Sequence, residues 1–490
     1  MMELLPVASL LMLVSAGLAI MLLDVFARGR AELPFVTTIA LLAAAATSAA
    51  GLFAPTPTDV PSFITDYLSV DKYGLFFDVV IALGAALASL LAGGYLREHG
   101  MDRGEYYVLT LFSALGAMVM ARAVDLLTLF VGLETLSLGV YSLVAYRRTS
   151  ARATEAAVKY FLLGSFASAI FLFGAALVYG ATGHTDFHGI GEVIDGGHAP
   201  VVLVVIGLAM LVAGLGFKVS AVPFHMWTPD AYEGAPTSTT AFMSVVVKTA
   251  AFAVFLRLLA VGFGGELRTG INGWPGLLSA LSAVTMVYGN LAAVTQTSVK
   301  RMLAYSSIAH AGYLLLGLAA VATQPEQATS AVLYYLAAYT VSNALVLGAL
   351  IWSGSFGKEA TSYADLAGLG RRHPAVGAAF IVGILSLMGF PPTAGFFGKW
   401  YVLSAAVQAD MVPLTILAVL SSAVGAFYYL KVLVFLYMKS PEEGAPVAVP
   451  MKSGYVTFAL VLAAYFVMKM GLTPSNYLDA ALAAASGLVS

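Results

Sequence analysis

The sequence predicts an all-α polytopic membrane protein that forms a single transmembrane domain over residues 1–490. Three observations indicate this fold class. Hydrophobic residues make up 60% of the chain and charged residues only 10%, whereas soluble domains carry about 25% charged residues. The mean hydropathy is +0.90. Long apolar stretches recur along the chain without the alternating pattern of transmembrane strands, so helices must satisfy the backbone.

Fourteen apolar stretches are candidate spans, because a spanning helix needs about 20 largely apolar residues. They are 4–26, 35–53, 74–95, 106–121, 124–146, 157–180, 201–221, 236–262, 275–296, 302–321, 328–353, 375–406, 412–438 and 453–471. The first stretch has neither a basic segment before it nor a small-residue cleavage site after it. We interpret it as a retained span and not as a signal peptide.

The positive charges between the spans predict the orientation. Fourteen lysines and arginines lie in the loops after odd-numbered spans, and four lie on the alternate side. Because basic loops stay in the cytoplasm, both termini are expected on the outer side. The residues of the odd loops are Arg28, Arg30, Arg97, Arg103, Arg147, Arg148, Arg152, Lys300, Arg301, Lys358, Arg371, Arg372, Lys439 and Lys452; the alternate ones are Lys72, Arg122, Arg268 and Lys469.

The composition also argues against several functions. A net charge of −2 gives no general attraction to nucleic acid, so no nucleic-acid partner is expected. The chain has no cysteine, which excludes thiolate metal sites, cysteine-ligated iron–sulfur clusters and disulfides. His184, His188 and His198 share one loop but lack the ordered spacing of metal ligands. We interpret this loop as a solvated outer loop and expect no metal site.

Four charged residues lie deep inside predicted spans: Glu134, Lys218, Lys248 and Lys399. Glu134 follows Asp125 by nine residues, which places it roughly 13 Å deeper, near the middle of the membrane. Inserting a charge at the centre of a helix costs on the order of 3 kcal/mol, and such residues are functional by default. Because burial brings lysines toward titration at neutral pH, lysines on several helices and one glutamate can form a proton relay.

Four further residues are possible members of this relay: His225, His310, Lys159 and Lys431. An imidazole titrates near neutral pH and is suited to proton transfer. A buried histidine with one local hydrogen bond is the alternative interpretation of His310. Lys159 and Lys431 lie toward helix ends, where lysines often extend to the membrane surface. For these residues the sequence alone leaves both the relay role and the structural alternative open.

Prolines interrupt two of the predicted spans. Pro223 breaks span 7 within KVSAVPFHMW, and Pro391 and Pro392 break span 12 within PPTAGFFGKW. A broken helix inside a membrane leaves polar backbone groups free, so it belongs at a polar cavity. The two motifs lie five spans apart, which reverses their orientation and predicts inverted five-helix repeats over spans 4–8 and 9–13.

This repeat divides the chain into four segments. Residues 1–105 hold spans 1–3, residues 106–262 the first repeat, residues 275–438 the second repeat, and residues 453–490 the last span and a tail.

Five motifs together resemble the antiporter-like membrane subunits of respiratory complex I. They are GLETLSLGVYSL, KYFLLGSFASAIFLFG, KVSAVPFHMWTPDAYEGAPTSTTAF, KRMLAYSSIAHAGY and GFPPTAGFFGKW. Among these subunits the chain looks most like the subunit N type of NADH-quinone oxidoreductase. Subunit L is longer and carries a lateral helix after its last span, and subunit M usually has a glutamate where this chain has Lys399.

The resemblance implies a fold of fourteen helices with two inverted repeats and a role in translocating protons. By this resemblance Glu134 matches the glutamate of span 5, Lys218 its partner in span 7, and Lys248 and Lys399 the lysines of spans 8 and 12. His225, His310 and Lys159 match further relay positions.

The resemblance also implies where the rest of the machinery lies. No cofactor is expected on this chain, because NADH, FMN, iron–sulfur clusters and quinone belong to other subunits. The expected partners are other membrane-arm subunits, antiporter-like and small, within the lipid bilayer. The expected location is the bacterial inner membrane.

A subunit of a multisubunit Na⁺/H⁺ antiporter is the alternative function, because such transporters share this ancestry. The wording of the motifs favours complex I. A purely structural role would leave four charges inside spans without an explanation.

Overall fold

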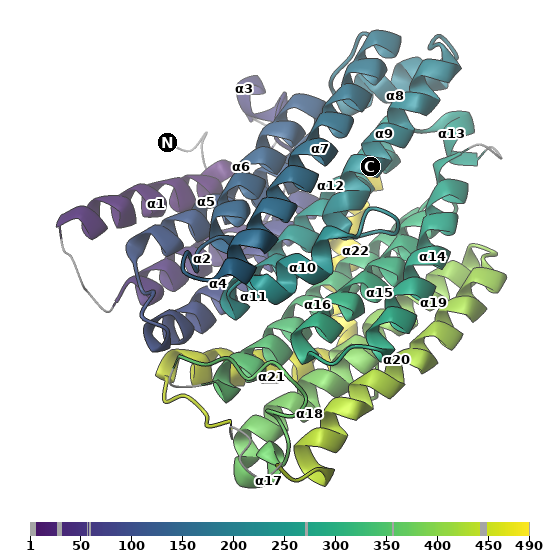
Figure 1. Cartoon of the computed structure of the whole chain (residues 1–490). Coiled ribbons are helices and arrows are strands. Elements are labelled where there is room, and N and C mark those ends of the chain that lie inside the picture. Colours follow the sequence, from purple (N-terminus) through teal and green to yellow (C-terminus); the bar gives the residue numbers. More distant parts are fainter. Residues whose placement is uncertain are drawn as a thin grey trace.

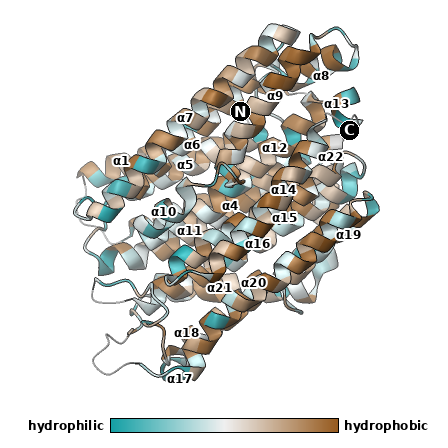
Figure 2. Ribbon diagram, turned by 45° about the vertical axis from the view of Figure 1, so that its right-hand side comes forward, coloured by the Kyte–Doolittle hydropathy of each residue, from teal (hydrophilic) through white to brown (hydrophobic). Residues whose placement is uncertain are grey.

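The computed structural model describes residues 6–26, 32–55, 57, 60–269, 273–354, 357–441 and 448–489. Over this part the chain is a bundle of long helices whose hydrophobic segments lie between more polar ends (Figure 1, Figure 2). Twelve continuous helices match twelve of the predicted spans. They are α1 (Ala8–Phe26), α2 (Leu33–Phe53), α4 (Lys72–Glu98), α5 (Gly104–Arg122), α6 (Leu126–Val144), α7 (Ala151–Thr182), α9 (Val201–Val219), α14 (Trp274–Val294), α15 (Val299–Ala320), α16 (Pro325–Ser353), α20 (Val412–Met438) and α21 (Gly454–Leu472).

The remaining two spans are built from pieces. Span 8 consists of α11 (Thr237–Phe242), a π-helical turn η2 (Met243–Val247) and α12 (Lys248–Gly262), which follow one another without a gap. Span 12 consists of α18 (Pro374–Met388) and α19 (Ala394–Gln408). Thirteen helical segments of the described chain are long and apolar enough to cross a membrane. The broken α18–α19 pair supplies the fourteenth predicted span.

Both predicted helix breaks are present. After α9 the chain leaves the helix at Ser220, which has a φ of +66°, and resumes at α10 (Trp227–Gly234). After α18 it leaves at Gly389, with a φ of +86°, and resumes at α19. Glycine is required at two close approaches around the second break. A Cβ on Gly395 would overlap the carbonyl oxygen of Ser386, and a Cβ on Gly471 would overlap that of Pro392.

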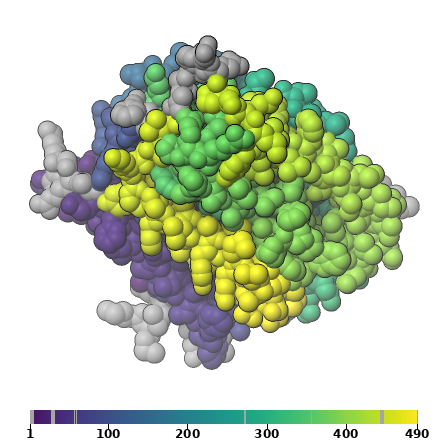
Figure 3. Space-filling view, turned by 90° about the horizontal axis from the view of Figure 1, so that it is seen from below, coloured from purple at the N-terminus to yellow at the C-terminus, as the bar shows by residue number. Residues whose placement is uncertain are grey.

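Short helices complete the fold: α3 (Ser62–Thr65), α8 (Phe187–Asp195), α13 (Gly265–Thr269), α17 (Leu369–Arg372) and α22 (Pro474–Val489). The sequence analysis gave the residues of α22 only as a tail after the last span. Its end lies against the start of α4, since Gly487 faces the backbone of Lys72 and Tyr73. Seen from below, the C-terminal helices lie between the N-terminal helices and the second half of the chain (Figure 3).

We call the bundle end with Arg97, Arg147 and Arg301 the inner end, and the opposite end with Asp66 and Asp186 the outer end. Two residues that the sequence placed in loops are in fact buried. Arg122 ends α5 and Lys300 begins α15, and both side chains are 0% exposed. Arg28 and Arg30 of the predicted inner loops lie outside the described residues.

Glu134 is not the only acid inside a span. Asp78 of α4 is fully buried and lies 3.4 Å from the guanidinium of Arg122. The hydroxyls of Ser9 and Ser48 donate to the same carboxylate oxygen at 3.0 and 3.2 Å. A second buried pair joins Arg257 of α12 to Asp71 through bonds of 2.6 and 3.0 Å. Removing one partner of such a pair leaves an uncompensated buried charge, so these pairs fix α1, α2, α4, α5 and α12 to one another.

Glu359, in the segment after α16, joins the two repeats at the inner end. Its carboxylate accepts hydrogen bonds from Tyr95 at 2.6 Å and from the hydroxyl of Thr237 at 2.6 Å, and lies 3.7 Å from Lys300. Burial by itself would raise the pKa of Glu359. The positive charge of Lys300 and the hydrogen bonds outweigh burial and hold this pKa at about 2, below the ordinary 4.5.

We expect Glu359→Gln to destabilise the folded chain by the same amount at pH 6 and pH 8. A lowered folded-state pKa stabilises the protein fully above the unfolded pKa of 4.5, and this stabilisation is lost as the pH falls toward about 2. The shift corresponds to a loss on the order of 3 kcal/mol. Thermal unfolding of wild type and variant at both pH values measures it. A difference that grows between pH 6 and pH 8 would contradict the assignment.

Candidate functional site: a line of lysines inside the bundle

Lys218 lies in the last turn of α9, directly before the first helix break. Its side chain is 3% exposed. The ammonium donates to the hydroxyl of Ser137 at 2.7 Å and lies 3.4 Å from the hydroxyl of Tyr141. It also lies 5.4 Å from the centre of the Tyr141 ring and 5.9 Å from that of Tyr160. Aromatic faces at these distances attract a cation, so the site holds an ammonium without a carboxylate in direct contact.

Glu134 lies one turn before Ser137 on α6. Its carboxylate accepts a hydrogen bond of 2.5 Å from the hydroxyl of Ser168 on α7. Among the ion pairs within 4.0 Å in the described chain, none joins Glu134 to Lys218. Lys218 and Glu134 therefore lie near each other without direct contact: Ser137 contacts the lysine, and Glu134 lies one turn before Ser137 on the same helix.

Glu134 is half-buried and belongs to an outward-facing stripe of α6. Its neighbours on this stripe are Leu127, Val131 and Leu138, which are 57%, 59% and 55% exposed. A carboxylate that faces lipid at this depth costs several kcal/mol. This stripe therefore has the character of a face that another protein covers.

Lys248 lies in the middle of span 8, at the end of the π-helical turn η2. Its side chain is 2% exposed, and its ammonium donates to both the carbonyl oxygen and the hydroxyl of Ser307, each at 2.5 Å. The Ser307 hydroxyl also contacts the hydroxyls of Tyr339 at 2.9 Å and Tyr232 at 3.3 Å. Single π turns often occur at functional sites, and this one precedes the central lysine.

His310 lies one turn after Ser307 on α15. Its Nδ1 lies 2.7 Å from the hydroxyl of Tyr335, and its Nε2 lies 3.0 Å from that of Tyr429. Tyr429 is also hydrogen-bonded to Ser306. The ring of Tyr339, which contacts Ser307, lies 5.0 Å from the imidazole. The structure thus brings His310 next to the surroundings of Lys248, with a hydroxyl at each ring nitrogen.

Lys399 lies on α19, just after the second break. Its ammonium donates to the carbonyl oxygen of Met388 at 2.9 Å and to the hydroxyl of Ser422 at 3.0 Å. It lies 5.2 Å from the centre of the Tyr313 ring. Met388 is the last residue of α18, so the lysine of the second half-helix reaches back across the break to the first.

Asn290 of α14 connects the surroundings of His310 and Lys399. Its amide oxygen accepts from Tyr428 at 3.0 Å, and its amide nitrogen donates to Tyr313 at 3.0 Å. The rings of Tyr428 and Tyr429 lie 4.5 Å apart. From Lys248 to Lys399 the described side chains therefore follow one another through serine and tyrosine hydroxyls, an imidazole and one amide. The sequence analysis named only Lys248, His310 and Lys399 of this series.

We expect Tyr428→Phe to lower proton translocation by roughly fivefold, because it removes one hydrogen bond worth about 1 kcal/mol from this series. Proton uptake by sealed vesicles that contain the assembled complex measures the effect. The matched control is Tyr465→Phe, which removes a hydroxyl from an exposed ring of α21. Equal rates in the two variants would contradict a role for the Asn290 link.

The other predicted residues lie apart from this line. Lys159 is 47% exposed and contacts Asp230 of α10 at 2.9 Å, and the same carboxylate accepts from Arg301 of α15 at 2.9 Å. Asp230 thereby ties the half-helix α10 to both repeats. Lys431 donates to the carbonyl oxygen of Gln296 at 3.2 Å and lies over the ring of Tyr363.

His225 lies within the first break, near the ring of Tyr288 at 4.6 Å. Its Nδ1 has no hydrogen-bond partner among the described atoms. In the described part of the chain, no group of three or more potential ligands could hold a metal ion.

Comparisons with known proteins agree with this architecture. The family described as "NADH:quinone oxidoreductase/Mrp antiporter, TM" matches residues 123–425. A relative from Sorangium cellulosum named NADH-quinone oxidoreductase subunit N 1 is 52% identical over 98% of this chain and 97% of its own length.

Two solved structures show the same fold. A chain of respiratory complex I from Thermus thermophilus is 34% identical, with a TM-score of 0.80 over 96% of this chain and 98% of its own. A chain of the Mrp complex from Dietzia sp. has a TM-score of 0.83 over 100% of this chain and 97% of its own, but only 21% identity, so it shows the fold alone. The chain belongs to the subunit N family of NADH-quinone oxidoreductase, respiratory complex I.

Proposed function

We propose that this chain translocates protons as a membrane-arm subunit of NADH-quinone oxidoreductase in a bacterial inner membrane. Electron transfer from NADH to quinone takes place in other subunits, which hold FMN, the iron–sulfur clusters and quinone. Both termini face the periplasm. The observation that carries the proposal is a series of three lysines inside the bundle, the buried Lys218 and Lys248 and the part-buried Lys399. Each is held by hydroxyls or carbonyls and none by a carboxylate within 4.0 Å in the described chain.

Such a series can move protons because each of its members can both donate and accept one, or can rotate a hydroxyl between two neighbours. Ser307 and Tyr339 lead from Lys248 to the imidazole of His310, which lies 5.0 Å from the Tyr339 ring, and Asn290 lies between Tyr428 and Tyr313. Lys218 and Glu134 form the end of the line nearest the exposed stripe of α6. We propose Glu134, Lys218, Lys248 and Lys399 as the main relay and His310 as an intermediate carrier.

Lys159, His225 and Lys431 have different assignments. His225, with its open ring nitrogen in the first break, is the best placed of the three to exchange protons with that break. Lys159 binds Asp230 and Lys431 a backbone carbonyl, so we assign them to fixing helix positions at the inner end.

The exposed stripe of α6 also supports assembly with another membrane subunit. Leu127, Val131 and Leu138 are apolar and suited to lipid, whereas the half-buried carboxylate of Glu134 on the same face is not. A neighbouring subunit that covers this face would exclude lipid and could exchange a proton with Glu134. In this proposal the relay starts at a subunit boundary.

The test uses Lys399 in the intact complex. We expect Lys399→Met to lower proton translocation in sealed vesicles, and Lys399→Glu to retain more of it because an ionisable group remains. Quinone reduction, assembly and proton uptake are measured together. Full translocation by an assembled Lys399→Met complex would refute the relay assignment.

Sodium flux tests the antiporter alternative. The relationship to the Mrp chain extends only to the fold, at 21% identity. We expect no ²²Na⁺ uptake above that of vesicles with an inhibited complex. Sodium uptake driven by a proton gradient would favour the antiporter.

A further inference from the structure

Lys300 is a buried lysine that the proposed relay does not use. Three of the described lysines are buried, Lys218, Lys248 and Lys300, with 3%, 2% and 0% of the side chain exposed. Lys300 lies in the first turn of α15, and its ammonium donates to the carbonyl oxygen of Ala235 at 2.6 Å. A buried charge in a membrane protein is costly and is functional by default.

Charged side chains connect Lys300 to the inner surface. The carboxylate of Glu359 lies 3.7 Å from the ammonium, and its side chain is 18% exposed. Arg147 lies 4.0 Å from the other oxygen of Glu359 and is 31% exposed. Glu233 of α10 is the second carboxylate near Lys300 and accepts from the hydroxyl of Ser298 at 2.8 Å. Protons of the inner solution therefore reach Lys300 past partly exposed polar groups, and Lys300 has a carboxylate partner that the relay lysines lack.

Hydroxyls of span 8 lead from the surroundings of Lys300 to Lys248. Ala235, which accepts from Lys300, lies just before the start of this span. Along the span Thr240, Ser244 and Lys248 follow one another at intervals of four residues, which is about 6 Å of helix rise. Both hydroxyls are buried, and each donates to a nearby backbone carbonyl oxygen at 2.9 Å. One water can bridge two hydroxyls at this spacing, because each of its hydrogen bonds spans about 2.8 Å.

Helix α15 provides a second connection between the two lysines. Lys300 and Ser307 are seven residues apart on this helix, so they share one face and are separated by two turns, about 10 Å. Ser307 holds the ammonium of Lys248 through its hydroxyl and its carbonyl oxygen. The hydroxyl of Tyr232 on α10 lies 3.3 Å from the same serine hydroxyl. The inner side of Lys248 is thus lined by hydroxyls from α10, span 8 and α15.

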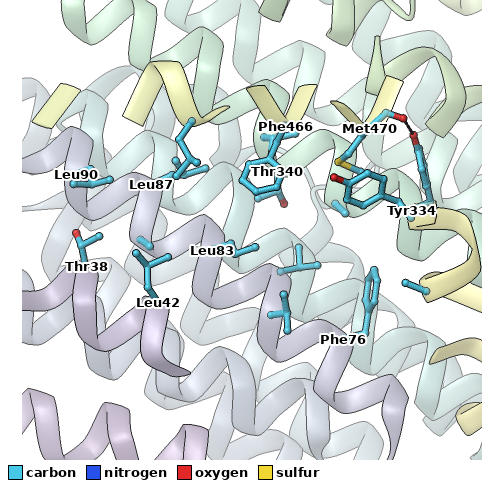
Figure 4. Close-up of a pocket in the computed structure, with 18 residues that line it drawn as sticks. Thr38, Leu42, Phe76, Leu83, Leu87, Leu90, Tyr334, Thr340, Phe466 and Met470 are labelled. Atoms are coloured by element: carbon cyan, nitrogen blue, oxygen red, sulfur yellow. Dashed lines mark hydrogen bonds between the residues drawn. The ribbon is translucent and has the colours of Figure 1, made fainter. Parts of the chain in front are cut away.

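An apolar groove that also borders α16 offers no competing route for protons. It lies between α2 and α21, over a floor formed by α4 and α16 (Figure 4). It encloses a cavity of about 150 Å³, lined by carbon-rich side chains such as Leu83, Leu87 and Phe466. Apolar cavities of this kind stay free of water. The polar side chains between Lys300 and Lys248 are therefore the better path for protons from the inner end.

We propose that Lys300 stores the proton with which Lys248 is reloaded from the inner side. This inference rests on the proposed relay and adds its inner entrance. After Lys248 has passed its proton toward Lys399, one proton leaves the ammonium of Lys300 and reaches Lys248 over the hydroxyls and a bridging water. The neutral amine of Lys300 then takes up one proton from the inner solution. The negative charge of Glu359 favours this uptake, since it stabilises the ammonium form.

The test measures proton translocation by the intact complex in sealed vesicles whose medium bathes the inner end. Lys300→Arg keeps the charge beside Glu359 but does not release a proton. We expect a severalfold loss of translocation at pH 8 and a smaller loss at pH 6, because Lys248 must then be reloaded directly from the solution. Quinone reduction and assembly are measured alongside. Normal translocation at pH 8 would overturn the inference, as would a loss of the same size at both pH values, which indicates a structural role.

A second variant covers the case in which arginine does not fit the buried site. Lys300→Met combined with Glu359→Gln removes both charges, so no buried charge stays uncompensated, and we expect the same pH-dependent loss. The matched control combines Arg148→Gln with Glu105→Gln, which removes a 3.3 Å ion pair at the inner end and should leave translocation unchanged. Normal translocation by the assembled Lys300→Met, Glu359→Gln complex at pH 8 would refute the entrance.

The Lys248→Ala variant distinguishes the two proposals. If it loses translocation while both Lys300 variants keep it, the relay stands and the entrance at Lys300 is refuted. If Lys248→Ala translocates normally, the relay itself fails.

Discussion

Replacement of Lys248 by alanine is expected to lower proton translocation by roughly a hundredfold, the lower end of the range for loss of a positioned proton-transfer group. The ammonium is the only group that joins α12 to both the carbonyl and the hydroxyl of Ser307 among the described side-chain contacts. Alanine removes the ammonium from this buried site and leaves the Ser307 hydroxyl to Tyr339 and Tyr232. Proton uptake and quinone reduction by sealed vesicles with the assembled complex measure the loss.

Lys248→Arg separates proton transfer from charge. An arginine keeps the positive charge and the donors but does not release its proton in proteins. We expect the arginine variant to assemble and still to fail in translocation. Lys439→Ala, at an exposed position after α20, controls for the loss of a lysine as such. Normal translocation by an assembled Lys248→Ala complex would disprove the central role of this residue.

Glu134→Gln is expected to have the second largest effect and to lower translocation severalfold. Glutamine can still accept the hydrogen bond from Ser168 but can no longer carry a proton or a charge. Because Glu134 lies one turn before Ser137, whose hydroxyl accepts from Lys218, the effects of the two substitutions should depend on each other. A double-mutant cycle with Lys218→Met measures this dependence as a deviation from additivity.

Glu134→Asp is the matched control, because it keeps the carboxylate and shortens the side chain by one methylene. We expect it to recover part of the translocation that Glu134→Gln loses. Full additivity of Glu134→Gln and Lys218→Met would show that the two residues act separately, contrary to the proposed relay.

The sequence predicted the helices and the lysines because both signals are local. Lys248 stands out inside an apolar stretch, and Pro223 and Pro391 mark the two breaks directly. The predicted spans agree with the observed helices within a few residues, including the broken span 12. A cost of several kcal/mol for each buried charge makes such residues rare, and rarity is what makes them visible in a sequence.

The partners of these lysines could not be predicted, because they come from distant parts of the chain. Nothing in the sequence distinguishes Tyr339 or Asn290 from the other tyrosines and polar residues of these helices. Only the packing of the helices places them between the lysines. Asp78 escaped notice because its partner, Arg122, looked like a loop residue. Lys300 likewise looked like an ordinary loop charge, because its partner, Glu359, comes from a distant segment of the chain.

The contact between Lys399 and the end of α18 has a consequence for how the membrane interior tolerates this charge. A helix that stops at Met388 presents unpaired carbonyl oxygens and the negative pole of its dipole at that point. The carbonyl of Met388 accepts from the lysine at 2.9 Å, and Lys218 likewise occupies the last turn of α9. At Lys399 the interrupted backbone thus takes the part of a counter-ion, and no carboxylate has to be buried beside it; at Lys218 the ammonium is held by the hydroxyls of Ser137 and Tyr141 instead.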